Sequence, residues 1–417
     1  MKFYRILFIF TVLILSFNYV VLADDENEEI PSNFDSITEV SSDISKEPSI
    51  NSRAAIIYDR SSHSILFGKK EYEKRKMAST TKIMTAIIVI ENSKLDDIVT
   101  VSSKSAGTGG SRLGLKKNDK ISVRDLLYGL MLCSGNDAAV ALAEHVSGDL
   151  PGFATLMNKK CEFLNLNSTH FVTPHGLDND AHYTTAYELA IITDYALKNE
   201  NFSKIVRTKN YTVSINGKTK NISNTNELLG NLDGVYGVKT GFTNGANRCL
   251  VTSVKRGNMD LICIVLGSDT KKDRTRDSVQ LIEYAFKNFE MINIREKITT
   301  EFDNWKLCNS STFCVKKGIS NDVDVVLADL PYDFFPVNCN YINEISIYIY
   351  CNTTFDAPLP ANSAIGYLTV SVHNQNVLSL DIYNSNEIRQ KNYSDFFNEF
   401  IKKYISYLES LLYKNIY

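Results

Sequence analysis

Hydrophobic residues follow two different spacings in the first two thirds of the chain. Apolar positions at helical spacing predict a helix that starts near Ser79, and further helices at 123–146, 151–164, 184–198 and 273–288. Short strand-like runs stand at both ends of this region, at 54–60, 63–68, 249–254 and 260–267. The last two runs, CLVTSV and DLICIVLG, are joined by KRGNM and are expected to be antiparallel neighbours. Helices enclosed by strands, without a repeating βαβ series, predict an α+β domain over residues 51–292.

Helical periodicity fades after about residue 293. The stretches VDVVLADL, EISIYIYC and AIGYLTVSVHNQNVLSLDIY lie among Pro, Asn and Gly residues and read as short strands. They predict a small all-β domain, a β-sandwich, over residues 293–390.

The last segment, residues 391–417, returns to helical spacing. Its apolar face consists of Phe396, Phe397, Phe400, Ile401, Tyr404, Ile405, Leu408, Leu411 and Leu412. Lys402, Lys403 and Lys414 only balance Asp395, Glu399 and Glu409, so apolar burial has to carry any membrane binding. We expect an amphipathic helix that associates with a membrane surface. The alternatives are packing on the β-domain and packing on a second copy of the chain.

The N-terminus predicts export. Lys2 and Arg5 precede the apolar run ILFIFTVLIL, and VLA at 21–23 offers small residues for cleavage, as in a secretory signal peptide over residues 1–23. An uncleaved anchor is the alternative, and it also places the chain outside the cytoplasm. Residues 24–50 contain nine acidic residues and one lysine and are expected to form a disordered acidic leader.

Charge and cysteine content exclude some functions. A formal net charge of −3 gives no basic footprint for nucleic acid. No C-x-x-C pair occurs among the eight cysteines, so the sequence indicates no zinc site. Cys308, Cys314, Cys339 and Cys351 could form two disulfides in any of three pairings, or remain thiols.

The first candidate for chemistry is MASTTKIMTA, residues 77–86. Ser79 and Lys82 stand at i and i+3, so a helix places both side chains on one face. A serine hydroxyl becomes a nucleophile when a base removes its proton, and a lysine is such a base only when its pKa is lowered. Burial by the apolar run that follows acts in that direction. Taken alone, the pair is better explained by an N-cap serine and an exposed lysine.

Two later stretches change this interpretation. In the first, Ser134 and Asn136 follow LLYGLMLC, where an apolar helix ends. In the second, GVYGVKTGFTNGA, a predicted strand carries Lys239, Thr240 and Gly241. Glycine at the last position would let a substrate backbone approach closely.

STTK, SGN and KTG in this order resemble the active-site signature of penicillin-binding proteins and class A β-lactamases. The chain resembles the D-alanyl-D-alanine carboxypeptidases among the low-molecular-mass penicillin-binding proteins. HFVTPHGLDNDAHYTTAYELA and NTNELLG also fit that group, which uses S-G-N in place of S-D-N. The resemblance covers about 50–290 closely. DAPLPANSAIGYLTVSVHNQNVLSLDIY resembles the family's C-terminal β-domain more loosely.

The resemblance implies a serine-type carboxypeptidase without a cofactor. Ser79 would attack the D-Ala-D-Ala bond of a peptidoglycan stem pentapeptide, and Lys82 would accept its proton. The remaining catalytic roles would fall to Ser134, as proton relay, and to Asn136, which holds Lys82 and the substrate amide. β-Lactams would acylate the same serine.

Further roles concern substrate and charge. Lys239 would supply positive charge, Thr240 would bind the substrate carboxylate, and Gly241 would permit its close approach. Backbone N–H groups of Ser79 and Phe242 would form the oxyanion hole. Arg248 is a candidate carboxylate ligand.

Two residues near the predicted site, a histidine and a cysteine, are interpreted as structural. His175, in TPHGLD, is expected to be a structural histidine near the site, and Cys133 a buried thiol at a helix end. The implied location is the outer face of the cytoplasmic membrane or the cell wall of a bacterium, where the helix at 391–417 would hold the enzyme.

Three other functions were considered, of which the first two remain open. A peptidoglycan endopeptidase or transpeptidase would use the same residues. A penicillin-recognising sensor or wall-binding protein would be acylated without turnover. A β-lactamase is disfavoured, because EFLN at 162–165 is one residue shorter than the E-x-x-L-N stretch of that class and the β-domain is foreign to it.

Overall fold

The computed structural model describes residues 47–414, with the side chains of 412–414 excepted. The predicted signal peptide and most of the acidic leader lie outside the described residues. The chain divides into two compact units, of which the first ends at Asn288 and the second begins at Phe289. Each unit is described by itself.

An antiparallel five-stranded sheet forms the centre of the first unit, in the order β2-β1-β9-β8-β7. Its strands are β1 (Ala54–Asp59), β2 (Ile65–Lys69), β7 (Val235–Thr243), β8 (Asn247–Arg256) and β9 (Met259–Ser268). Strands β8 and β9 pair as predicted, with Val251 opposite Ile264, and the runs predicted as strands at 54–60 and 63–68 pair with each other as β1 and β2. The outer position of β7 leaves one of its edges unpaired within this sheet.

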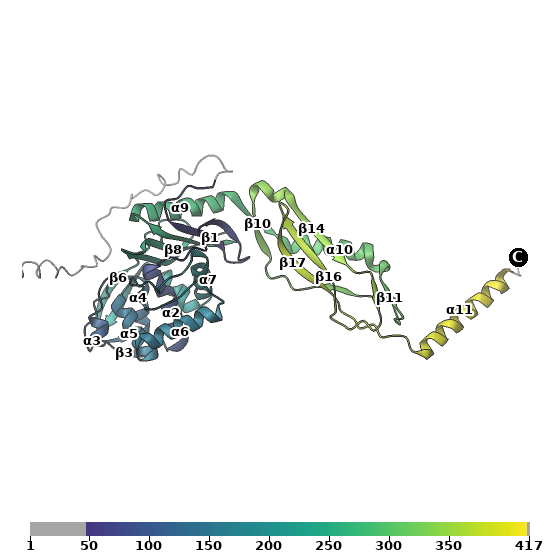
Figure 1. The fold of residues 1–417 in the computed structure, drawn as a ribbon, viewed down its shortest axis with the longest axis horizontal. Coiled ribbons are helices and arrows are strands. Elements are labelled where there is room, and N and C mark those ends of the chain that lie inside the picture. Colours follow the sequence, from purple (N-terminus) through teal and green to yellow (C-terminus); the bar gives the residue numbers. More distant parts are fainter. Residues whose placement is uncertain (1–46, 415–417) are drawn as a thin grey trace, which may run out of the picture. The chain divides into compact units, whose positions relative to one another are not determined.

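Helices cover both faces of this sheet (Figure 1). On one face lies α9 (Lys271–Asn288), which packs on β8 and β9. The other helices of the unit are η2 (Ala78–Thr81), α2 (Lys82–Asn92), α3 (Ser103–Ala106), α4 (Val123–Met131), α5 (Asn136–Ser147), α6 (Leu150–Phe163), α7 (Ala186–Leu197) and α8 (Glu200–Val206). The predicted helix at 123–146 is thus two helices, separated by residues 132–135. The α+β prediction is confirmed.

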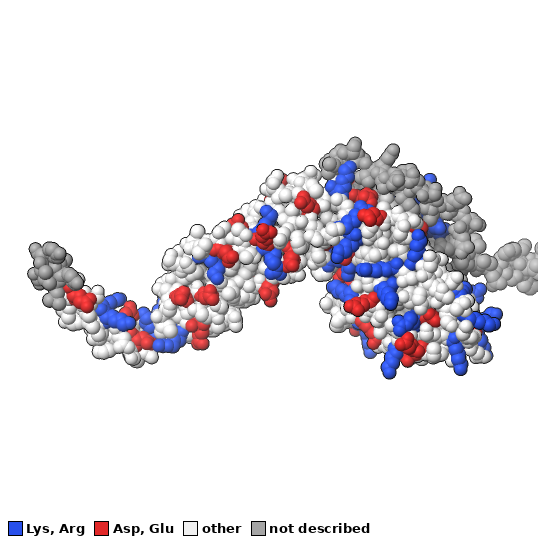
Figure 2. Space-filling model, turned by 180° about the vertical axis from the view of Figure 1, so that it is seen from behind, with Lys and Arg blue, Asp and Glu red and all other residues white. Residues whose placement is uncertain are grey.

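Two small hairpins stand apart from the main sheet. One pairs β3 (Ile98–Thr100) with β4 (Lys120–Ser122), and the other pairs β5 (Asn210–Ile215) with β6 (Lys218–Ser223). The backbone N–H of Asn216, in the β5–β6 turn, donates to the Lys120 carbonyl at 3.0 Å, so the hairpins are neighbours. Figure 2 shows Lys and Arg side chains gathered at the end of the unit that carries α3 and β6 in Figure 1.

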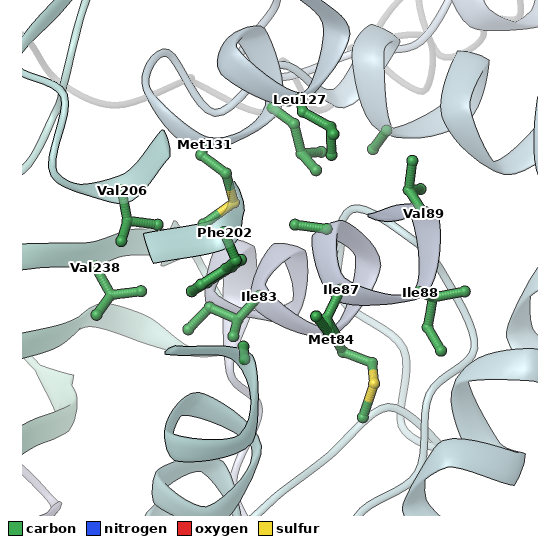
Figure 3. Packing of buried hydrophobic residues seen from close by; sticks show 14 of the residues in the cluster. Ile83, Met84, Ile87, Ile88, Val89, Leu127, Met131, Phe202, Val206 and Val238 are labelled. Atoms are coloured by element: carbon green, nitrogen blue, oxygen red, sulfur yellow. The ribbon is translucent and has the colours of Figure 1, made fainter. Parts of the chain in front are cut away.

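The core of the first unit surrounds α2. Figure 3 shows Ile83, Met84, Ile87, Ile88 and Val89 of this helix among Leu127 and Met131 of α4, Phe202 and Val206 of α8, and Val238 of β7. These side chains are almost completely buried. Every residue of α2 from Lys82 to Val89 is buried, so even the first residue of the helix is removed from water.

The second unit contains three sheets. Four strands pair antiparallel in the order β12-β17-β16-β14, while β10 pairs antiparallel with β13 and β11 pairs parallel with β15. Their bounds are β10 (Phe289–Asn293), β11 (Cys314–Lys316), β12 (Val325–Leu327), β13 (Phe334–Asn338), β14 (Ile345–Cys351), β15 (Thr354–Asp356), β16 (Ala364–Val372) and β17 (Gln375–Asn384). Two 3-10 turns, η3 (Ser310–Thr312) and η4 (Cys339–Glu344), connect them.

A helix that the sequence analysis did not predict packs in this unit. It is α10 (Ile294–Asn309), and it buries Ile294, Ile298 and Phe302 in the same core as the strands. Only these three residues, four apart, form its fully buried stripe, which is too narrow to stand out as a helical pattern. The Asn293 side chain caps the helix by accepting the backbone N–H of Glu296 at 3.1 Å.

The last helix of the chain exposes a row of large apolar side chains. Helix α11 (Tyr393–Lys414) follows the predicted bounds closely. Large apolar side chains along it are exposed: Tyr393, Phe396, Phe397, Phe400, Tyr404, Ile405, Tyr407, Leu408 and Leu411. Within residues 47–414, no helix has both the length and the apolar character needed to cross a membrane. All eight cysteines are free thiols.

Candidate active site

Ser79 lies in η2, one turn before α2 begins. Its side chain is partly exposed, whereas its neighbours on both sides are buried. The preceding residue, Ala78, has a φ of +49°, a conformation that non-glycine residues rarely adopt. Helix α2 thus presents Ser79 from a tight, strained turn, while its apolar body anchors the turn in the core.

The ammonium nitrogen of Lys82 meets three oxygen atoms. Nζ lies 2.8 Å from Ser79 Oγ, 2.7 Å from Asn136 Oδ1 and 2.9 Å from the His175 carbonyl oxygen. A charged lysine donates to all three. A neutral lysine keeps two N–H donors, which the two carbonyl oxygens occupy, so its lone pair is left for the serine hydroxyl. The geometry therefore suits Lys82 as the acceptor of the Ser79 proton.

Burial favours the neutral form of this lysine. Lys82 is 0% exposed, and loss of hydration lowers its pKa well below the ordinary value. The positive charge of Lys239 lowers the pKa of Lys82 further. The predicted cause, burial by the apolar run, is thus the larger one.

The second motif connects α4 to α5. Ser134 is buried and has a φ of +58°, and Asn136 is the first residue of α5. The Asn136 side chain is held at both ends, because its Oδ1 accepts from Lys82 and its Nδ2 donates to the Gly109 carbonyl at 2.8 Å. Its backbone N–H donates to the Ser111 carbonyl at 2.8 Å. The Gly/Ser-rich loop at 105–114 is therefore part of the site, which the sequence analysis did not assign.

The third motif lies on β7, the edge strand. Lys239 is 1% exposed, and its Nζ donates to the Thr240 carbonyl at 3.0 Å. A Cβ added to Gly241 would lie 3.1 Å from the Ser79 backbone nitrogen and 3.2 Å from the Met77 carbonyl oxygen. Any side chain at this position would crowd the turn that carries Ser79. Glycine therefore favours the close approach of the enzyme's own backbone.

Two candidate substrate ligands stand opposite each other on β7 and β8. Phe242 pairs with Arg248 across the strands, and the guanidinium carbon lies 4.2 Å above the centre of the Phe242 ring. The Arg248 side chain is therefore held beside the segment that follows Gly241. This position is consistent with its candidate role as a carboxylate ligand.

The hydroxyl of Thr240 has a partner that the sequence analysis missed. Thr225 Oγ1 lies 2.7 Å from Thr240 Oγ1, and the Thr225 backbone N–H donates to the Leu132 carbonyl at 3.1 Å. Thr225 thus connects the third motif to the residues just before the second. The NTNELLG stretch drew attention to this segment only through the family resemblance.

The loop that contains TPHGLD packs against the turn that carries Ser79. A Cβ added to Gly176, whose φ is +85°, would overlap the Ala78 carbonyl oxygen. Asp178 accepts from Thr243 Oγ1 at 2.7 Å and from the Gly245 backbone N–H at 2.9 Å. The His175 ring accepts the Leu177 N–H at 3.2 Å. The ring is structural, as expected, but the backbone carbonyl of His175 contacts Lys82.

A second histidine, His182, supports η2, the turn that carries Ser79. The Val172 N–H donates to His182 Nδ1 at 3.0 Å, so the neutral ring carries its proton on Nε2, 2.8 Å from Thr81 Oγ1. The Thr81 hydroxyl in turn donates to the Ala78 carbonyl at 2.8 Å. This chain of bonds positions the residue next to Ser79.

The geometry can be compared with two other kinds of site, that of a β-lactamase and that of a metal enzyme. Glu162, in the EFLN stretch of the β-lactamase comparison, is an exposed residue of α6. In the described part of the chain, no group of three or more His, Cys, Asp and Glu side chains gathers where it could hold a metal ion. The site brings together a serine hydroxyl, a lysine whose pKa is lowered, a side-chain amide and a second, buried lysine. These belong to Ser79, Lys82, Asn136 and Lys239.

Comparisons with known proteins agree with this constellation. A family profile described as D-alanyl-D-alanine carboxypeptidase, Peptidase S11, matches residues 41–270. The D-alanyl-D-alanine carboxypeptidase DacF of Bacillus subtilis is 32% identical over 324 residues, which cover 76% of this chain and 81% of the relative. DacD of Escherichia coli is 36% identical over 270 residues, covering 61% and 69%.

Solved structures give the same result. Penicillin-binding protein 5 from Haemophilus influenzae superposes with a TM-score of 0.69 at 29% identity, covering 83% of this chain and 99% of that one. The Streptomyces K15 DD-transpeptidase superposes with a TM-score of 0.56 at 35% identity, covering 58% and 99%. The chain belongs to the D-alanyl-D-alanine carboxypeptidase family of serine penicillin-binding proteins.

Proposed function

We propose that the chain removes the terminal D-alanine from peptidoglycan stem pentapeptides through an acyl-enzyme on Ser79. The observation that carries this proposal is the placement of Lys82 Nζ, 2.8 Å from Ser79 Oγ and between two carbonyl oxygens. A lysine in this position accepts the serine proton as the hydroxyl attacks the substrate carbonyl.

Acylation develops negative charge on the substrate oxygen. Backbone N–H groups of Ser79 and Phe242 stabilise that charge, and the closeness of Gly241 to the Ser79 nitrogen supports their convergence. The proton held by Lys82 then passes, with Ser134 as relay, to the nitrogen of the departing D-alanine. A water molecule hydrolyses the acyl-enzyme and restores Ser79.

In this proposal the substrate binds along β7, the outer strand of the sheet. The free edge of β7 offers backbone groups to an extended peptide, which would add to the sheet as another strand. The hydroxyl of Thr240 and the guanidinium of Arg248 bind the terminal carboxylate, and buried Lys239 adds positive charge. β-Lactams carry a carboxylate beside a reactive amide and would acylate Ser79 in the same pose.

The decisive experiment measures D-alanine release from a soluble pentapeptide ending in D-Ala-D-Ala. We expect release by the wild-type chain and a mass increase on Ser79 after penicillin treatment. Ser79→Ala should lose both, while circular dichroism shows the same fold. Stable penicillin acylation without D-alanine release would favour the penicillin-recognising sensor and contradict the carboxypeptidase.

Transfer to an amine is the second candidate, because the Streptomyces K15 structures that this chain matches bear the name DD-transpeptidase. In that reaction an amino group replaces water as the acceptor. Adding glycine or a diamino acid to the assay and analysing products by mass spectrometry distinguishes the two. Cross-linked peptide as the main product would assign the transfer reaction, and cleavage of isolated cross-links would assign an endopeptidase.

We also propose that the enzyme works at the outer face of the cytoplasmic membrane. The support for export is the N-terminal pattern at residues 1–23. The support for membrane association is the row of exposed apolar side chains on α11.

A further inference from the structure

The first unit carries a concentration of positive charge that the proposed reaction does not use. Residues 101–122 and 207–223 contain nine Lys and Arg residues and a single acidic one, Asp119, in a chain whose net charge is −3. Arg207 stacks on the Tyr236 ring at 4.6 Å. The other eight form what we call the basic face: Lys104, Arg112, Lys116, Lys117, Lys120, Lys209, Lys218 and Lys220.

Hydrogen bonds join the two segments into one surface. Besides the bond from the Asn216 backbone, the Lys120 N–H donates to Asn216 Oδ1 at 2.7 Å. Lys220 Nζ donates to the Leu113 carbonyl at 2.6 Å. Residues a hundred positions apart therefore present their charges together, at the end of the unit where Figure 2 shows blue side chains gathered.

The charges of the basic face are not neutralised by carboxylates. All eight side chains belong to exposed residues, and none forms an ion pair with the described part of the chain. Several other basic residues of the unit are paired, as in Lys160–Glu91 at 2.8 Å and Arg256–Glu283 at 2.6 Å. An unpaired cluster of this size repels itself and is stabilised by an external polyanion.

The basic face borders the active site. Gly109 and Ser111, whose carbonyls hold Asn136, directly precede Arg112 in the same loop. A ligand on the basic face would therefore lie beside the nucleophile without occupying its place. Binding there would keep the enzyme close to polymer-rich regions of the wall.

We propose that the basic face binds a flexible anionic polymer of the cell wall built from phosphodiester units. Seven of its eight cations are lysines, which act as mobile point charges and require no fixed geometry from their ligand. Binding of this kind is insensitive to ligand sequence, and it weakens steeply with salt because counterions are released.

A lipid bilayer fits the basic face less well. Large apolar side chains that could enter a bilayer are absent from the exposed residues of both segments. A flat bilayer against Arg112 would also lie against the loop that holds Asn136, whereas a linear polymer can pass beside this loop.

The test uses the full chain and labelled inorganic polyphosphate, followed by fluorescence anisotropy over a series of salt concentrations. The variant combines Lys116→Gln, Lys117→Gln and Lys218→Gln. Its matched control combines Lys159→Gln, Lys255→Gln and Lys287→Gln, three exposed lysines of the same unit that also form no ion pair with described residues. The basic-face variant should bind at least about 10-fold more weakly at low salt, with a salt slope smaller by about 2. The control variant should match the wild type.

Two further measurements separate the outcomes. Both triple variants should keep wild-type D-alanine release from a soluble pentapeptide, whereas Ser79→Ala should lose release and keep polyphosphate binding. Equal losses in both variants, or no binding at low salt, would overturn the proposal. So would a basic-face variant that loses binding to phosphatidylglycerol vesicles while polyphosphate binding is unchanged, since that result assigns the surface to a membrane.

Discussion

Lys82 has to be buried to act as a base and has to be held to act in the right direction. Burial lowers its pKa, and the carbonyl oxygens of Asn136 and His175 occupy two of its N–H groups. The same carbonyls would stabilise a charged lysine as well. The proximity of Lys239 shifts the balance toward the neutral form.

The first prediction concerns this balance. Lys239→Ala removes the charge that lowers the pKa of Lys82, so that pKa should rise. Because the base acts when neutral, the acidic limb of the kcat/KM profile should move to higher pH. Lys255→Gln, an exposed lysine at the end of β8, should leave the limb in place. A profile that drops uniformly without moving would mean that Lys239 serves substrate binding alone.

A second residue-scale prediction concerns Thr225. Thr225→Val removes the hydroxyl 2.7 Å from Thr240 Oγ1 and leaves Thr240 free to rotate. The loss of about 1 kcal/mol should lower kcat/KM for the pentapeptide roughly fivefold, mainly through KM. Thr225→Ser keeps the hydroxyl and should recover most of the activity. A loss in Thr225→Ser together with wild-type activity in Thr225→Val would show that the methyl group matters instead.

At the scale of elements, the loop at 172–182 supports the turn that carries Ser79. Its His182 connects to Ala78 through Thr81, and Gly176 packs against the same carbonyl. Burial lowers the pKa of His182 to about 4 from an ordinary value of 6.5. The folded chain therefore resists a proton that the unfolded chain accepts.

This difference gives a pH prediction for stability. Above pH 6.5 His182 is neutral in both states and contributes no pH dependence. As the pH falls from 6.5 to about 4, the unfolded state gains a proton first, so the free energy of unfolding should fall, by ~3 kcal/mol from this group. Urea unfolding of His182→Gln should show a flatter decline over this window. His145→Gln, a histidine of α5 outside this network, should decline like the wild type.

Helix α11 gives a second prediction at this scale. A chain ending at Asn392 lacks the exposed apolar row from Tyr393 to Leu411. If that row inserts at a lipid surface, the shortened chain should remain in the supernatant when vesicles are sedimented, while the full chain pellets. High salt should change the result little, because positive and negative charges on the helix balance. A shortened chain that still pellets would assign membrane binding to another surface.

At the scale of the whole molecule, every residue proposed for catalysis lies in the first unit. We propose that residues 47–288 fold alone, as expected of a unit with its own core. This fragment should release D-alanine from a soluble pentapeptide within about threefold of the full chain. A folded but inactive fragment would show that the second unit contributes to the reaction.

Local patterns predicted much of this protein. The helix after Ser79, the β8–β9 pair and the last helix follow from residue spacing, since an amphipathic periodicity is a property of consecutive residues. The order STTK, SGN and KTG singled out Ser79 and Lys82 as the proposed nucleophile and base before any contact was known. A narrow buried stripe, as in α10, carries too little signal and was missed.

Tertiary structure decided which atoms meet. Contacts of Lys82 with the His175 carbonyl, of Asn136 with Gly109 and of Thr240 with Thr225 join groups that sequence spacing does not relate. Two of these three use backbone carbonyls, which every residue possesses and no sequence motif marks. The basic face likewise exists only because two distant hairpins pack together.

The sequence alone therefore determined which reactive groups are proposed and which chemistry they could perform, because that chemistry resides in side-chain identity. The fold determined that the pKa of Lys82 is lowered and which atoms surround its nitrogen, because both depend on burial and on partners distant in the chain.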